Sequence, residues 1–454
     1  MHYGFEEAKK ILLAQLDEAM RVDNDPKRGS VILRFKVPLV NVDPVAWLAG
    51  QTSSRKVFWR SAGGALTVAG IGSAFEITAD GWYALEELYA RINAMMQACP
   101  EARFFVGMSF NRSVSALEWK NFPAIRFILP AVELVCHAEG VFLAVNVVRG
   151  APEAPLDGRI RMELEKLRFI NNVSSGDIIL SSREDVPDYE DWVMAAEQAE
   201  RALENGVLQN IVMARRVTIE LENMVFPEKM LETFLTEQQD DFAFLFSAGE
   251  DVFFGVSPEL LCVRNGNRVK SLAILGVCPR GVDAAHDDRL SHSLLKSDKL
   301  LRGHNLFAGA MIEVFRQFCR SYQVDRESEV FSRAHHHQLA VRLSGTLSED
   351  ITDREFLQAL HPSPVVSGMP AEKARLFLQQ HEVFDRGWFC GPVGFLSKDY
   401  TELAVAARAC LLEEKSLHAY ASAVFTKGTD PLEAWEQAAS GMKVVLDIIH
   451  GART

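Results

Sequence analysis

Residues 118–134 read EWKNFPAIRFILPAVEL, and the run AIRFILP within this stretch is rich in the β-branched and aromatic residues that strands favour. Similar runs lie on both sides of it. They are SVILRFKVPL at 30–39, ALTVAGIG at 65–72, RFFVGMSF at 103–110 and GVFLAVNVV at 140–148. Residues 6–22 and 83–98 instead carry apolar positions at helical spacing. The first half of the chain therefore mixes strands with helices.

The later part of the chain continues this mixture. Helices are predicted at 191–205, 286–322 and 431–449, and QNIVMARRVTI at 209–219 is a predicted strand. Because strands and helices do not alternate as regular units, a doubly wound parallel sheet is disfavoured. We predict an α+β fold of stacked, mainly antiparallel sheets flanked by helices.

A polar segment near residues 150–190 offers the best place to divide the chain. It predicts an N-terminal α+β half at 1–185 and a second region at 186–454. We expect the two to be parts of one intertwined fold.

Composition excludes several classes of protein. The chain has 454 residues, is 48% hydrophobic and carries a formal net charge of −13 without any basic run, which argues against nucleic acid as a partner. No apolar stretch approaches the roughly 18 to 20 residues of a membrane span, and no secretion signal is visible. The seven cysteines are scattered and indicate neither a disulfide framework nor a zinc site. These features predict a soluble, cytoplasmic protein.

Two short patterns resemble binding motifs but do not support a binding site. Gly70 and Gly72 in GIG precede SAFEIT, which reads as more strand, so no helix start is available to hold a pyrophosphate. In the run His335, His336, His337, neighbouring side chains on a strand point to opposite faces. We therefore expect a surface or hydrogen-bonding role for these histidines rather than a metal site.

Seven further motifs follow one another along the chain. In order they are NIVMARR (210–216), VSPELL (256–261), DKLLRGH (298–304), LHPSPVVSG (360–368), FDRGWFCGPVGF (384–395), ELAVAARA (402–409) and a closing helix from Trp435 to Lys443. Together with residues 118–134, their order and spacing resemble the chorismate-utilising enzyme family, of the isochorismate-synthase kind. The resemblance implies one large α+β fold that holds chorismate between its layers, near the C-terminal half.

An isochorismate synthase needs three chemical parts. A general base activates water, a general acid protonates the departing hydroxyl, and magnesium neutralises the ring carboxylate. The resemblance assigns the acid to Glu259, which requires a pKa raised by burial. It assigns the binding of substrate carboxylates to Arg408 and Lys443. Within FDRG (384–387), a structural turn with an internal ion pair is expected.

Other parts of this chemistry are replaced in the sequence. At the position of the base stands Asn210, whose amide cannot take a proton at neutral pH. The two positions that hold metal-binding carboxylates in the family are Gly303 and Gln437 here. Because magnesium prefers anionic oxygens, the magnesium that the family implies should bind weakly, and no metal ligand is assigned.

Two more positions differ from the family in the same way. Gln338 stands where a histidine is expected, and the turn that presents backbone N–H groups to a substrate carboxylate reads AYASAV, with Tyr420 and Ser422. A tyrosine at this place could fill the pocket. The resemblance nevertheless implies that Tyr420 and Ser422 are substrate-binding candidates.

Three functions follow from the resemblance. The first is isomerisation of chorismate to isochorismate for menaquinone or siderophore biosynthesis, with weak or lost activity. The alternative is a non-catalytic binding or regulatory paralogue. An amine-using anthranilate or aminodeoxychorismate synthase fits less well, because residues 118–134 are of the isochorismate type and position 210 lacks the expected glutamine. A monomer is the default expectation.

Overall fold

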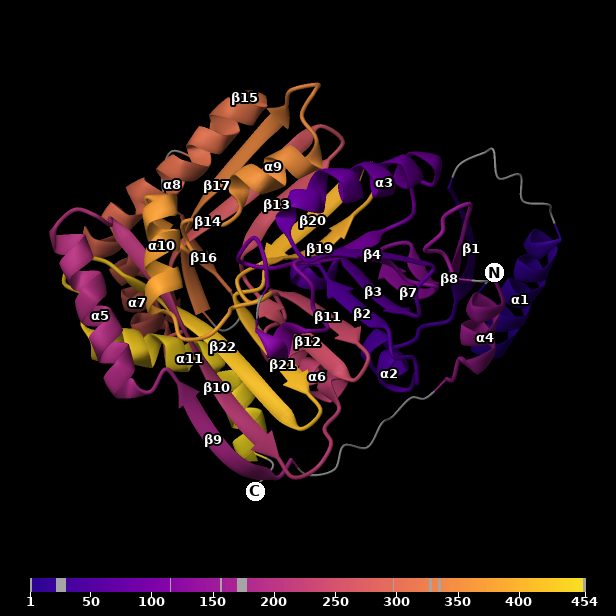
Figure 1. The fold of residues 1–454 in the computed structure, drawn as a ribbon, viewed down its shortest axis with the longest axis horizontal. Coiled ribbons are helices and arrows are strands. Elements are labelled where there is room, and N and C mark those ends of the chain that lie inside the picture. Colours follow the sequence, from indigo (N-terminus) through magenta and orange to yellow (C-terminus); the bar gives the residue numbers. More distant parts are fainter. Residues whose placement is uncertain are drawn as a thin grey trace.

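The protein is described by a computed structural model of residues 2–21, 30–114, 116–155, 157–169, 178–296, 298–325, 329–333 and 336–451. Two large sheets form its centre, and helices cover their outer faces and ends (Figure 1). All pairings between the named strands are antiparallel. The predicted α+β class with mainly antiparallel sheets is confirmed.

The first sheet contains 12 strands. In spatial order they are β1 (Val31–Leu39), β8 (Gly140–Arg149), β7 (Val132–His137), β3 (Leu66–Ile71), β2 (Lys56–Arg60), β11 (Phe242–Ala248), β12 (Asp251–Ser257), β21 (Arg408–Glu413), β22 (Ser416–Phe425), β10 (Asn210–Leu221) and β18 (Gly368–Met369), with β9 (Leu180–Val186) also paired to β10.

The second sheet contains 10 strands. In spatial order they are β15 (Cys319–Val324), β17 (His336–Leu347), β14 (Arg268–Pro279), β13 (Leu260–Asn265), β20 (Tyr400–Val405), β19 (Pro392–Leu396), β5 (Phe104–Met108), β6 (Ile125–Leu129) and β4 (Phe75–Ala79), with β16 (Glu329–Ser332) also paired to β17.

The helices pack around these sheets (Figure 1). They are α1 (Phe5–Met20), α2 (Pro44–Ala49), α3 (Leu85–Ala98), α4 (Asp157–Lys166), α5 (Tyr189–Glu204), α6 (Pro227–Glu237), α7 (Ala284–Lys296), α8 (Asp298–Phe318), α9 (Asp353–Leu360), α10 (Ala371–His381) and α11 (Pro431–Gly451). The closing helix α11 lies along β22, and α8 lies along β14 and β15.

Each sheet draws strands from both sides of the boundary expected at residue 185. The first sheet joins β1 to β3 with β10 to β12, and the second joins β4 to β6 with β13 to β17, β19 and β20. The two halves therefore share both sheets, and the boundary itself stays a prediction.

One predicted helix ends earlier than the sequence pattern suggested. The stretch expected at 286–322 consists of α7 and α8, and the chain turns into strand at Cys319. Residues 319–324 read CRSYQV and pair with the edge of β17. The open edge of a sheet thus outweighs the weak helical pattern at these positions.

Residues 118–134 pass from one sheet to the other. They supply β6 to the second sheet and, after Pro130 and Ala131, β7 to the first. Trp119 is fully buried, and its indole N–H donates to the carbonyl of Asp385 at 3.1 Å. Gly387 has a φ of 50°, and a Cβ added there would lie 2.0 Å from the Trp119 ring. Residues 118–134 therefore pack directly on the FDRG turn at 384–387.

Candidate active site

Glu259 lies in the link between β12 and β13. Its backbone N–H donates to Ser257 Oγ at 3.1 Å, and its carbonyl accepts from the N–H of Val405 at 3.0 Å. Burial raises the pKa of the Glu259 carboxyl to about 7, although the nearby Arg408 guanidinium opposes the rise. A carboxyl with this pKa is partly protonated at neutral pH and can donate a proton, while the role of Glu259 as the acid stays a prediction.

Arg408 begins β21 next to this carboxyl. Its Nη1 lies 3.7 Å from Asp241 Oδ2, which is longer than a charge-assisted hydrogen bond. The Arg408 side chain is 28% exposed, whereas that of Asp241 is 2% exposed. The structure thus brings Glu259 and Arg408 together, with the cation reachable from solvent.

Ser422 joins the same group through Cys390, a residue that the sequence reasoning missed. Cys390 is fully buried with a φ of 62°, which is uncommon for a residue other than glycine. Burial raises the pKa of its thiol to about 12, with Arg386 opposing the rise, Glu259 adding to it and a hydrogen bond from Ser422 lowering it. Its position inside FDRGWFCGPVGF was the available signal, since that motif is one of the seven on which the resemblance rests.

Tyr420 fills space in this region. Its ring stacks on Phe389 with centroids 5.3 Å apart and also contacts Trp119 at 5.7 Å. Burial raises the pKa of its phenol, and the neighbouring Arg216 opposes the rise. An aromatic ring so enclosed occupies volume and offers little surface to a ligand, so its part in substrate binding stays a prediction.

Asn210 starts β10 and is fully buried. Its amide Nδ2 reaches only the carbonyl of Pro364, at 3.5 Å, and its Oδ1 has no hydrogen-bond partner among the described residues. Gln338 is buried as well, on β17, where its Nε2 lies 2.7 Å from His336 Nε2. Both positions thus present neutral amides, and neither can accept a proton from water at neutral pH.

The closing helix does not bring its candidates to this group. Gln437 is exposed, and Lys443, 68% exposed, pairs with Asp447 on the same helix. The helix face against the sheet includes Gly441, where an added Cβ would lie 3.1 Å from Ala421 Cβ. The role of Lys443 in carboxylate binding stays a prediction that this conformation does not support.

The metal positions do not fit magnesium. Gly303 lies in α8, and the side chains of residues 297–306 are outside the described residues. Across the described side chains, no three His, Cys, Asp or Glu residues come together as a metal site would require. Since Gln437 offers only an exposed amide, the donors present here are not those magnesium prefers.

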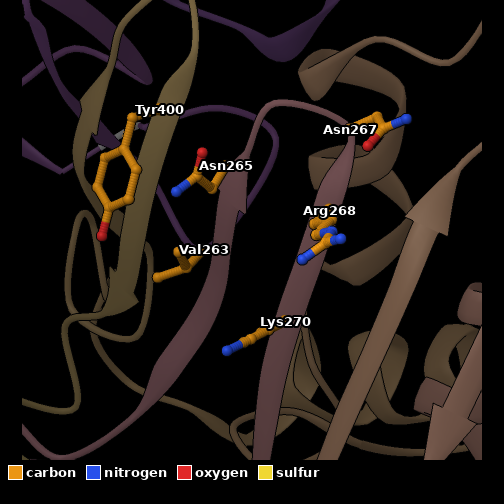
Figure 2. Close-up of a pocket in the computed structure, with 6 residues that line it drawn as sticks. All are labelled: Val263, Asn265, Asn267, Arg268, Lys270 and Tyr400. Atoms are coloured by element: carbon orange, nitrogen blue, oxygen red, sulfur yellow. The ribbon is translucent and has the colours of Figure 1, made fainter.

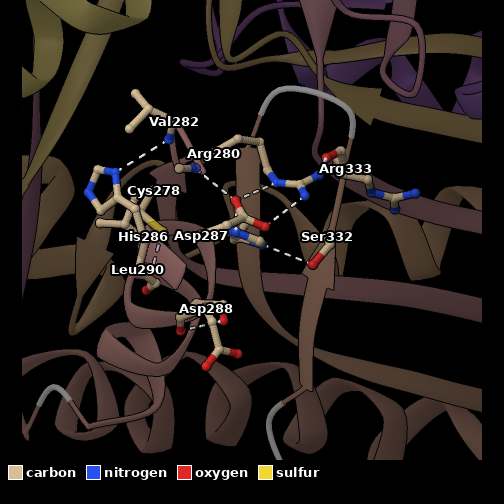
Figure 3. A network of polar contacts seen from close by, with 12 residues as sticks. Cys278, Arg280, Val282, His286, Asp287, Asp288, Leu290, Ser332 and Arg333 are labelled. Carbon is tan, nitrogen blue, oxygen red and sulfur yellow. Dashed lines mark hydrogen bonds and ion pairs between the residues drawn. The ribbon is translucent and has the colours of Figure 1, made fainter. Parts of the chain in front are cut away.

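A polar network joins Arg280, Asp287 and Ser332 to His337 on β17, one of the predicted histidines. Figure 3 shows the first three residues of this network. His337 Nδ1 lies 2.9 Å from Ser332 Oγ, and its Nε2 lies 2.9 Å from Asp287 Oδ1. Arg280 donates to both oxygens of Asp287, at 2.8 and 2.7 Å, and holds the pKa of that carboxyl well below its usual range. The hydrogen-bonding role expected for His337 is therefore present, whereas His335 lies outside the described residues.

A second titratable cluster was not anticipated from the sequence. His418 Nε2 lies 3.2 Å from Glu413 Oε2 across the hairpin of β21 and β22. Burial, with Asp251 nearby, raises the pKa of Glu413 to about 7, while Lys120 opposes the rise. Burial lowers the pKa of His418 to about 4. Glu413 and His418 are five residues apart, but Asp251 and Lys120 lie far from them in the chain, so only the strand register reveals the whole cluster.

This cluster makes stability depend on pH. Because the folded pKa of Glu413 lies above its unfolded value, its contribution is complete at low pH and is lost as pH rises through about 7. The variant Glu413→Gln should match wild type near about pH 4, below the unfolded pKa, and exceed it near about pH 8.5 by about 2 kcal/mol in free energy of unfolding. Urea unfolding at both pH values measures this, and equal differences at the two would contradict it.

Comparison with known proteins identifies the family of this chain. Residues 15–450 match the family model described as chorismate binding enzyme. The chain is 25% identical to "Isochorismate synthase MenF" of Bacillus subtilis over 98% of both chains, and 30% identical to "Isochorismate synthase DhbC" of that organism over 58% of this chain and 68% of the relative. The solved structure of the menaquinone-specific isochorismate synthase from Escherichia coli shares the fold, with a TM-score of 0.85 and 20% identity over 98% of this chain and 99% of that one.

Among the described helices, none is long and apolar enough to cross a membrane.

The family match spans nearly the whole chain, including every motif on which the resemblance was based. The chain belongs to the chorismate-binding enzyme family and is of the isochorismate-synthase type.

Proposed function

We propose that this protein binds chorismate in the region of Glu259 and Arg408 and converts it to isochorismate far more slowly than a complete isochorismate synthase does. The observation that carries the proposal is Asn210. At the position of the base, a buried neutral amide stands where a proton acceptor is needed. We further propose a cytoplasmic role in menaquinone or siderophore biosynthesis, the pathways that the sequence resemblance implies.

Arg408 can bind the substrate, and Glu259 can supply the acid step of the reaction. Arg408 is a cation beside a partly protonated carboxyl, so a substrate carboxylate can pair with the guanidinium without meeting a full negative charge at Glu259. Glu259 in its protonated form can donate to a departing hydroxyl. Activation of water is the missing step, because neither Asn210 nor Gln338 can take its proton.

The direct test combines turnover with binding. Purified protein is incubated with chorismate, with and without magnesium, and the products are separated chromatographically, while calorimetry measures chorismate binding. We expect binding together with little or no isochorismate. Robust isochorismate formation would contradict the loss of the base, and absence of binding would contradict the retained pocket. Binding with zero turnover would identify the protein as a binding or regulatory paralogue.

The affinity for chorismate should depend on pH. Below the pKa of about 7, Glu259 is neutral beside the bound dianion, and above it a carboxylate repels the ligand. Binding should therefore weaken as pH rises from about 6 to about 8, by up to about tenfold per unit above the pKa. Calorimetry on wild type and Glu259→Gln measures this, since the variant should bind with little pH dependence. A pH-independent wild type would refute the role of Glu259.

A further inference from the structure

A pocket of about 530 Å³ opens on the second sheet (Figure 2). It lies over β13, β14 and β20, near the turn that joins β13 to β14. Its lining consists of Val263, Asn265, Asn267, Arg268, Lys270 and Tyr400. Two of these six residues are cations and none is acidic, so the pocket is positively charged within a chain whose net charge is −13.

Strand register fixes the two cations side by side. Arg268 and Lys270 are two residues apart on β14 and therefore point to the same face of the sheet. Asn265 pairs with Arg268 on one side and with Tyr400 on the other, which sets the three in one row. Val263 pairs with Lys270 in the next row. The lining is thus held by the sheet rather than by a loose loop.

The two cations have no carboxylate partner within the described part of the chain. Arg264 lies between Val263 and Asn265 on β13, so its side chain points to the other face of the sheet. There it donates to Asp353 and to Thr401. Arg268 and Lys270 are exposed and form no ion pair with described residues. Like charges at neighbouring positions on one face repel, and a bound anion would remove that repulsion.

The lining also specifies what kind of anion fits. A guanidinium and an ammonium together suit a doubly charged oxyanion group, and two asparagine amides can bond hydroxyl or carbonyl groups of the same molecule. The Tyr400 ring and Val263 give an apolar wall, while the Tyr400 hydroxyl donates to Glu402 Oε1 at 3.4 Å. The volume exceeds that of a bare ion and is typical of pockets for small metabolites.

The pocket is separate from the candidate active site. Glu259 lies six residues before Asn265, the partner of Arg268 in the pairing of β13 with β14, and six residues of strand correspond to about 20 Å at ~3.3 Å per residue. We propose that this pocket is a second ligand site, which binds a small dianionic metabolite, either a phosphomonoester or a dicarboxylate, through Arg268 and Lys270.

Calorimetric titration tests the site with inorganic phosphate and with succinate at millimolar concentrations, and acetate serves as the singly charged control. The double variant Arg268→Gln/Lys270→Gln should weaken binding of the dianion by about tenfold or more. The matched variant Arg289→Gln/Lys373→Gln removes the same charge from two exposed positions elsewhere and should change binding less than about twofold. Thermal unfolding confirms that both variants are folded.

The pattern of results separates the ligand classes. Binding of phosphate alone indicates a phosphomonoester, binding of succinate alone indicates a dicarboxylate, and either result supports the site. The proposal is overturned if neither dianion binds, if acetate binds equally well, or if both double variants weaken binding alike. It is also overturned if Arg408→Gln abolishes binding while the pocket variant does not, because the anion would then lie in the active site.

Discussion

Replacing Arg386 with methionine is expected to lower the free energy of unfolding by about 3 to 5 kcal/mol. Arg386 is fully buried, and its Nε donates to Glu382 Oε2 at 2.9 Å. Its other nitrogens donate to the carbonyls of Val366 and Val212, at 2.8 and 2.6 Å. Methionine would leave Glu382 with the N–H of Ala214 as its remaining donor and would remove the guanidinium donor from two buried carbonyls. Chemical denaturation of both proteins measures the loss.

A matched control exists on the neighbouring helix. Arg375 pairs with Glu372 at 2.9 Å, but its side chain is 38% exposed and its partner's is 74% exposed. The variant Arg375→Met should cost less than about 1 kcal/mol, since water replaces the lost partner. Similar losses for the two variants would show that burial of the Arg386 pair adds nothing, and the account of the FDRG turn as a structural ion pair would be wrong.

The sequence predicted the fold through residues whose role is packing. Residues 118–134 hold Trp119, which donates to the FDRG turn, and Gly387, at a φ of 50°, has no Cβ to collide with the Trp119 ring. Motifs of this kind depend on residue size and backbone shape, both of which can be read from sequence. The predicted ion pair within FDRG differs in detail, because Arg386 pairs with Glu382 just before the turn.

Side-chain direction was harder to predict than position. Around a helix each residue advances by about 100°, so a shift of one or two positions moves a side chain from the sheet to solvent. Lys443 and Gln437 are both exposed, while Gly441 faces β22. The pair of Glu413 and His418 depends on strand register, and the pKa of Glu259 depends on burial. Side-chain direction, strand register and burial all depend on the whole fold, so a short motif does not contain them.

The variant Asn210→Lys/Gly303→Glu/Gln437→Glu is expected to form isochorismate about 10² to 10⁴ times faster than wild type. Lysine at the buried position 210 would lose hydration, which lowers its pKa and leaves part of it neutral and able to accept a proton from water. The two glutamates return the anionic oxygens that magnesium prefers. Turnover of chorismate, followed by chromatography with and without magnesium, measures the gain.

The single and double variants divide this gain between base and metal. Asn210→Met fills the same space as lysine without an amine, so it should give no gain if proton transfer is what wild type lacks. Since Gln437 is exposed, Gln437→Glu should add activity only if α11 turns that position toward the substrate, and then only when magnesium is present. If the triple variant binds chorismate as tightly as wild type and still makes no product, the missing base does not limit turnover. The shape of the pocket around Tyr420 would then be the cause, because a ring packed on Phe389 and Trp119 leaves the substrate no productive position.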